Sequence, residues 1–150
     1  MNLVRIVNEG QLIAIILRGD SLDEGIEFYT SDDSAQQVGA MSWSVGHQVT
    51  PHIHQIVERK VMRTQEVLII KKGKVRMDLY DDNQNYLESH IAGAGDIIYL
   101  SSGGHGFTML EDTVMVEIKQ GPYVGVQDKV RFDTVNESRL DIKSIWKVIL

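Results

Sequence analysis

The chain of 150 residues contains no cysteine, only two prolines and no long apolar run. Without cysteine it can form no disulfide, no thiolate metal site and no cysteine nucleophile, so any metal must be held by histidine and carboxylate side chains. No stretch approaches the roughly 20 apolar residues that cross a bilayer, and residues 1–10 lack the layout of a signal peptide. We therefore expect a cytoplasmic protein that does not associate with membranes.

Positive charge is also in short supply. The 15 Lys and Arg residues against 21 Asp and Glu residues leave a net charge of −6, which argues against nucleic acid as a partner. Hydrophobic residues at 43% and charged residues at 24% are ordinary globular proportions and exclude a disordered chain. At this length we expect a single domain over residues 1–150.

Glycine, by contrast, is abundant, with 13 residues spread along the chain. Most of these glycines separate short stretches rich in β-branched and aromatic residues, as turns separate strands, and Asn8-Glu9-Gly10 between the first two stretches predicts a hairpin turn. Residues 74–80 alternate strictly between apolar and polar, which is typical of a half-buried strand. The pattern predicts an all-β sandwich or barrel, with strands at residues 3–7, 12–17, 39–45, 66–70, 74–80, 86–91, 96–100, 107–110 and 114–119.

The C-terminus has a different pattern. Ile142, Ile145, Trp146 and Ile149 follow the spacing of an amphipathic helix, and Ser138 with Asp141 resembles a capping box. We expect a short helix over residues 136–149 that covers an open face or edge of the β-structure, with a swapped strand as the alternative.

The N-terminal region, residues 1–38, contributes strands before the main motifs. Residues 12–17 are apolar on both faces of the expected strand, so both faces need a cover. A second subunit would supply that cover, and we therefore expect a homodimer.

Two histidines stand two residues apart. On a strand, His52 and His54 would project from the same face, which is a sound way to present two imidazoles to one metal ion. His47 lies in the turn before this pair and His90 in an alternating strand with an exposed pattern, and we expect no functional role for either.

The surroundings of the pair carry a family resemblance. The segments GHQVTPHIH, EVLIIKKG and GDIIYLSSGGHGF place glycines and ligand-type residues in an order and spacing that resembles the two motifs of the cupins, which are small jelly-roll β-barrels. The resemblance covers about residues 39–120. It implies a cupin-type jelly-roll barrel whose metal ligands would be His52, His54, Glu66 and His105.

Histidine and carboxylate ligands suit a divalent Fe, Mn, Ni, Co or Zn ion, with coordination positions left open for substrate or water. Phe107 and Met109 share the strand face of His105 and are candidates for the lining of a ligand pocket. Trp43 shares its face with Met41 and Val45, which predicts core packing or a place in the pocket wall.

The identity of the carboxylate ligand is open between two residues. Glu58 has the standard distance from His54, whereas Glu66 opens an apolar run that ends at Gly73, as in the family's strand. We favour Glu66, because a loop between His54 and Glu66 can lengthen at little cost. His105 follows a glycine pair that is one residue shorter than the family's turn, and Gly103 and Gly104 can make that tighter turn.

Two classes of function follow from the resemblance. One is a metal-dependent cupin that binds or transforms a small molecule inside the barrel, as a dioxygenase or as a Lewis-acid isomerase or lyase, with catalytic residues unassigned. The other is a non-catalytic small-molecule-binding or sensor cupin, and the resemblance to small bacterial cupins makes a link to sugar or polysaccharide metabolism a secondary hypothesis.

Overall fold

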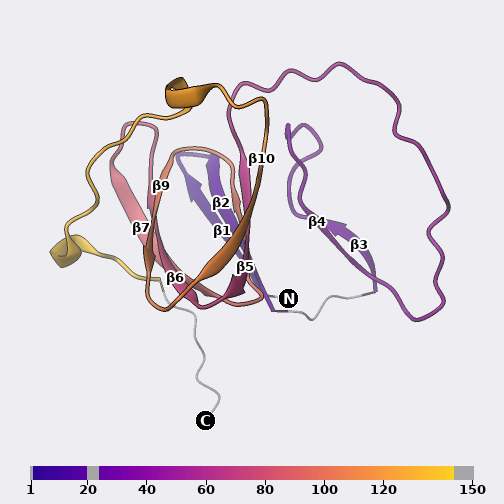
Figure 1. Cartoon of the computed structure of the whole chain (residues 1–150), viewed down its shortest axis with the longest axis horizontal. Helices are drawn as coiled ribbons and strands as arrows, with labels where there is room; N and C mark the ends of the chain where they lie inside the picture. The colour runs from indigo at the N-terminus through magenta and orange to yellow at the C-terminus, as the bar shows by residue number, and fades with distance from the viewer. Residues whose placement is uncertain (1, 20–23, 144–150) are drawn as a thin grey trace, which may run out of the picture.

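The computed structural model describes residues 2–19 and 24–143, which form ten strands and two short 3-10 helices (Figure 1). The prediction of an all-β fold is confirmed. Among the described residues, no helix has the length and apolar character needed to cross a membrane.

The larger sheet has five antiparallel strands in the order β1-β2-β8-β5-β10. Its strands are β1 (Asn2–Asn8), β2 (Gln11–Arg18), β8 (Ile97–Leu100), β5 (Glu66–Lys72) and β10 (Val114–Lys119). A two-residue turn at Glu9 and Gly10, both with positive φ, joins β1 to β2 as the sequence predicts. Residues 114–119 were predicted with the same bounds that the strand has.

The smaller sheet has three antiparallel strands in the order β7-β6-β9, which are β7 (Tyr86–Gly93), β6 (Lys74–Tyr80) and β9 (Gly104–Met109). Alternation along β6 sends Val75, Met77 and Leu79 toward the larger sheet, where all three are buried. Figure 1 shows the two sheets as opposite walls of a sandwich. The core between them is formed by Ile6, Ile13, Ala14, Ile16, Leu68, Ile70, Val75, Met77, Leu79, Ala92, Ile98 and Leu100.

A second, smaller core lies on the outer face of the larger sheet. Ile15, Leu17 and Tyr99 are buried there against Tyr29 and Val38 of the same chain. This packing explains why β2 is apolar on both faces. The expected second subunit is not needed as the cover, because the chain covers much of this face itself; the homodimer stays a prediction.

The segment that provides this cover contains a small hairpin, β3 (Gly25–Phe28) and β4 (Gly39–Ser42). The Arg5 guanidinium ties the segment to β1 by donating two hydrogen bonds to the Tyr29 carbonyl oxygen, at 2.6 and 2.7 Å. The strand predicted at residues 39–45 thus exists but ends at Ser42.

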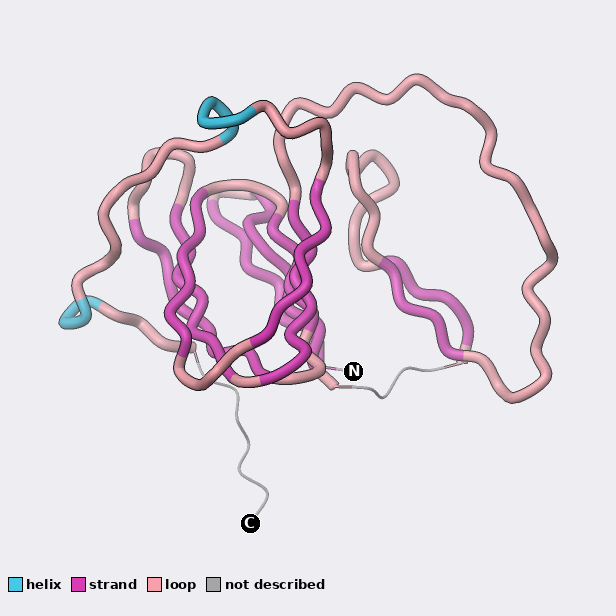
Figure 2. Tube along the Cα trace, in the orientation of Figure 1, coloured by secondary structure: helices cyan, strands magenta, loops and turns pink. Residues whose placement is uncertain are grey.

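Residues 43–64, called the arm below, connect β4 to β5 without regular secondary structure. Every residue of the arm is exposed. Figure 2 shows it as a long loop that runs outside the hairpin, away from both sheets. The loop expected between His54 and Glu66 is therefore longer than predicted, since it also includes His52 and His54.

The sandwich is open on one side. Among the described strands, β10 pairs only with β5 and β9 pairs only with β6. Because no strand joins β9 to β10, the sheets do not close into a barrel, and the predicted jelly-roll topology is not confirmed.

The helix expected over residues 136–149 is not confirmed. A 3-10 helix, η1 (Gly125–Asp128), follows β10, and η2 (Glu137–Arg139) begins after Asn136, whose side chain accepts a hydrogen bond from the Ser138 amide. The chain is then extended, and Ile142 forms a parallel bridge with Ser89 on β7. Ile145, Trp146 and Ile149 lie outside the described residues.

Candidate functional site

Glu66 and His105 come together at the open side of the sandwich. Glu66 is the first residue of β5 in the larger sheet, and His105 is the second residue of β9 in the smaller sheet. The Nε2 atom of His105 lies 3.1 Å from Oε2 of Glu66. Two predicted ligands that are far apart in sequence thus bridge the two sheets.

Strand register places both side chains on inner faces. Glu66 has the parity of Leu68 and Ile70, whose side chains lie in the core. His105 pairs with Leu79, another core residue. The side chain of Glu66 is 11% exposed and that of His105 is 31% exposed, so the pair lies at the mouth of the core and within reach of solvent.

The glycine pair before His105 allows the tight turn through which the chain enters β9. Gly103 has a φ of +70°, and a Cβ atom there would collide with the carbonyl oxygen of Tyr80. Only glycine fits this turn without strain, after which β9 begins at Gly104. The predicted role of the shortened glycine turn, delivery of His105 inward, agrees with this geometry.

The electrostatics of the pair favour a charged carboxylate. The hydrogen bond from His105 holds the pKa of Glu66 below its ordinary value of 4.5, while burial opposes this effect and the positive charge of Lys129 adds to it. On β10, Lys119 pairs with Glu66 in the sheet register, and its Nζ lies 3.5 Å from Asp128. The mouth of the sandwich is therefore polar and holds a carboxylate that is anionic at neutral pH.

The other two predicted ligands lie on the arm. His52 and His54 are exposed, with ring centroids 5.2 Å apart, and Nδ1 of His52 lies 2.9 Å from the Thr50 carbonyl oxygen. Within the described part of the chain, no group of three or more His, Asp or Glu side chains is placed to hold a metal ion. The structure brings the predicted ligands together as one pair in the sandwich and a second pair on the arm.

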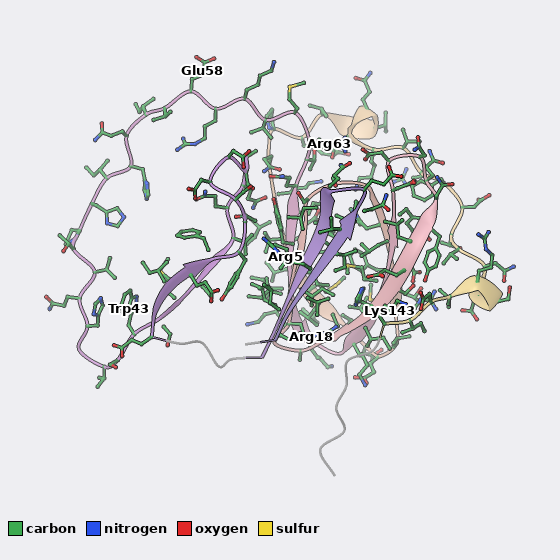
Figure 3. All side chains as sticks on the ribbon, turned by 180° about the vertical axis from the view of Figure 1, so that it is seen from behind. Arg5, Arg18, Trp43, Glu58, Arg63 and Lys143 are labelled. Atoms are coloured by element: carbon green, nitrogen blue, oxygen red, sulfur yellow. The ribbon has the colours of Figure 1, made fainter. Side chains whose placement is uncertain are left out.

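Glu58, the alternative carboxylate, is also on the arm. It is exposed, and Figure 3 shows its side chain on the outer edge of the arm, away from the sheets. Of the two carboxylates, Glu66 is therefore the one that lies beside another predicted ligand.

The three predicted pocket residues are in different surroundings. Phe107 is half-buried against the inner core, with its ring 5.6 Å from that of His105. Met109 is on the same strand and is 49% exposed. Trp43 begins the arm, where it stacks on His47 at 4.0 Å, so it does not line a site with Phe107.

The structure corrects the prediction for His90. Its strand pattern predicted an exposed side chain, but His90 is 2% exposed. Its Nε2 atom lies 2.7 Å from Oε1 of Glu88, and its Nδ1 atom is buried without a partner. The prediction failed because register pairs His90 with Met77, on the inner face of the smaller sheet, and no pattern within β7 alone reveals that pairing.

A cavity of about 370 Å³ lies on the opposite face of the larger sheet from Glu66. It is bounded by the outward side chains of β5 and β8 and by the segment before and within β4, including Val67, Ile69, Ile97, Val38 and Met41. Sequence reasoning did not predict this cavity, because it forms where the hairpin segment meets the sheet.

None of the protein-family models, curated proteins or solved structures compared with the chain matches it.

Proposed function

We propose that this protein is a metal-binding single-domain cupin that binds or transforms a small molecule between its two sheets. The observation that carries the proposal is the pairing of Glu66 with His105, 3.1 Å apart and from opposite sheets. The two residues belong to separate segments that resemble the two cupin motifs. Chance alone would not be expected to bring a carboxylate and an imidazole from these two segments together at the mouth of the core.

The donor chemistry fits a divalent metal. Glu66 would supply an anionic oxygen and His105 an imidazole nitrogen, a set that suits Fe, Mn, Ni, Co or Zn. When bound, such an ion with open positions either activates O2 beside a substrate or polarises a carbonyl or enediolate. Phe107 would give the small molecule an apolar wall beside the ion, and Lys119 a positive charge.

Metal content tests the proposal. The protein is purified without a polyhistidine tag, dialysed against each of the five divalent ions and measured for bound metal. We expect about one ion per chain, and a loss of at least tenfold in affinity in Glu66→Ala and His105→Ala. His47→Ala is the matched control, since His47 is an exposed histidine that only stacks on Trp43.

If the unmodified protein holds none of these ions above background, the metal-binding function is wrong. Where metal is bound, oxygen consumption with candidate substrates separates oxygenase from Lewis-acid chemistry. Glu58→Ala, with metal retained, assigns the carboxylate ligand to Glu66.

A second function is favoured by one observation. Within the described residues His105 already pairs with Glu66, and no group of three His, Asp or Glu side chains is placed to hold a metal ion. A non-catalytic small-molecule-binding or sensor domain, with a sugar-derived ligand as one candidate, would need nothing more. Ligand binding measured by calorimetry in metal-free protein, with an unchanged affinity after metal is added, would support this function over the first.

A further inference from the structure

The arm exposes an unusual amount of apolar surface. The large apolar residues of the arm are each at least 39% exposed. Two isoleucines, Ile53 and Ile56, are 88% and 104% exposed. Extended apolar surface of this kind marks an interaction site more often than a free surface. The exposed apolar residues of the arm are Trp43, Val45, Val49, Ile53, Ile56, Val57, Val61 and Met62.

Most of the backbone of the arm also lies outside any described backbone pairing. In the described part of the chain, residues 48–64 make no hydrogen bond to another backbone group. Where it meets β5, the arm is anchored by ion pairing of Arg63 with Asp82 at 2.7 Å and by a contact of Thr64 with Asp128, and near β4 the Ser44 hydroxyl lies 3.4 Å from Oε1 of Glu24. The rest of the arm has backbone amide and carbonyl groups outside any described strand pairing, together with β-branched side chains, which is a composition typical of a strand.

The open side of the sandwich offers the complementary surface. Strands β9 and β10 each have one edge without a neighbour among the described residues. The outer face of β10 exposes Val114, Val116 and Ile118, by 53%, 45% and 50%. Long apolar edges of this kind favour pairing with another segment. These edges also flank the Glu66–His105 pair, which links β5, next to β10, to β9.

The arm does not reach these edges in its own copy. Figures 1 and 2 show the β3–β4 hairpin between the arm and the edge formed by β5 and β10. The hairpin segment is held in that position by the outer core around Tyr29 and Val38 and by the hydrogen bonds from Arg5. The arm of a second copy is not joined to the receiving chain beside that hairpin, and it is therefore the occupant that we consider for the open side.

We propose that two copies exchange arms, and that the arm of each copy lies along β9 and β10 of the other. The exchange brings His52 and His54 of one copy to Glu66 and His105 of the other, so each site is built from two chains. At about 3.3 Å per residue the extended arm is roughly 70 Å long, and because both of its ends stay in its own copy it can reach about half of that, roughly 35 Å, toward the other. The metal part of this inference rests on the proposed function, whereas the exchange itself does not.

Complementation between two defective variants tests the shared site. One variant carries His52→Ala and His54→Ala on the arm, and the other carries Glu66→Gln and His105→Ala in the sandwich. Each variant alone has no complete site. In a mixed dimer, isolated through two different tags without histidine, one site regains all four ligands, so we expect about one metal ion per mixed dimer against about two for the unmodified dimer. No metal in the mixed dimer, while the unmodified protein binds it, would overturn the shared site.

Cross-linking tests the exchange without reference to metal. Because the chain has no cysteine, introduced cysteines are unique. A chain with Ile53→Cys is mixed with a chain carrying Val116→Cys and treated with a short bismaleimide. We expect a cross-linked pair of chains, and at least fivefold less of it when Asp33→Cys replaces Val116→Cys, since Asp33 is an exposed residue of the segment between β3 and β4.

Sedimentation completes the test. A dimer at micromolar concentration that is weakened at least tenfold by Val116→Lys supports the exchange, because a lysine on the edge of β10 opposes pairing. A monomer at that concentration would overturn it. A chain that carries both Ile53→Cys and Val116→Cys and cross-links only within itself would overturn it as well. Cross-linked dimers without bound metal would instead mean that the arms exchange and that the metal-binding function is wrong.

Discussion

The two pairs of predicted ligands differ in what holds them. Glu66 and His105 lie on strands whose neighbours fix their direction, and Glu66 sits beside the buried Leu100 in the sheet register. His52 and His54 lie on the arm, where their rings contact each other and Nδ1 of His52 lies 2.9 Å from the Thr50 carbonyl oxygen. The family resemblance implied all four residues as ligands, with Glu58 as the alternative to Glu66 and a shortened glycine turn before His105.

The difference teaches that a ligand motif carries geometric information only where its backbone is paired. A strand with two neighbours leaves each side chain one of two directions, so a single buried residue on that strand assigns all the others. An unpaired segment has no such constraint. The following predictions compare the sandwich with the arm.

The largest expected effect comes from the buried ion pair of the smaller sheet. Asp78, 2% exposed, accepts hydrogen bonds from Arg76 at 2.9 and 3.2 Å and from the Ser89 hydroxyl at 2.6 Å. Asp78→Ala leaves the Arg76 guanidinium buried without this carboxylate, and we expect the free energy of unfolding to fall by about 3–5 kcal/mol. Urea denaturation measures the loss. Asp82→Ala, at the foot of the arm, is the control and should cost less than about 1 kcal/mol.

A matched pair of isoleucines contrasts the core with the arm. Ile98 is 0% exposed and Ile53 is 88% exposed. We expect Ile98→Ala to lower the free energy of unfolding by about 2–5 kcal/mol, because it leaves a cavity in the core. Ile53→Ala in dilute protein should change it by less than about 0.5 kcal/mol. Equal losses in dilute protein would contradict the difference between the two regions, whereas a loss for Ile53→Ala that grows with protein concentration agrees with arm exchange.

Two glycines of the predicted motifs, Gly103 before β9 and Gly46 on the arm, allow the same comparison between the sandwich and the arm. Gly103 and Gly46 both have positive φ, but a Cβ atom at Gly103 would collide with Tyr80, and one at Gly46 would meet nothing within 4 Å. Gly103→Ala should cost about 1–3 kcal/mol from backbone strain, together with displacement of β9. Gly46→Ala should cost less, since the arm can relax. Thermal unfolding of both variants compares them, and a larger loss for Gly46→Ala would be evidence that the arm is packed.

The smallest expected effect concerns the ion pair of Arg63 with Asp82, where the arm meets β5, and is measured as the pKa of Asp82. The hydrogen bond from Arg63 lowers the pKa of Asp82 from 3.8 to about 2. A lowered pKa means that this contact stabilises the fold above about pH 3.8 and that the contribution is lost as the pH falls toward about 2. Arg63→Ala should raise the pKa of Asp82 toward 3.8, as measured by an NMR titration. Arg59→Ala removes a side chain that donates to the Val57 carbonyl oxygen, and it should leave the pKa of Asp82 unchanged.

Much of the β-structure could be predicted because it follows local rules. Strict alternation predicted β6 with its observed bounds, and Asn8, Glu9 and Gly10 predicted the turn between β1 and β2. His90 was assigned to the wrong face because its direction depends on pairing with β6, which the residues of β7 do not record. The end of β4 at Ser42 has the same cause, since the residues beyond it have strand composition but pair with no strand in the described part of the chain.

By itself the sequence determined the all-β class, most strand positions and the candidate ligands, because alternation, turn residues and ligand chemistry are local properties of the chain. Tertiary structure alone decided that Glu66 meets His105, that His90 is buried and that β9 and β10 remain edges. It also decided that the chain covers the outer face of β2 itself. Each of these depends on which strands pair and in which register, and that choice is made by contacts between residues far apart in the chain.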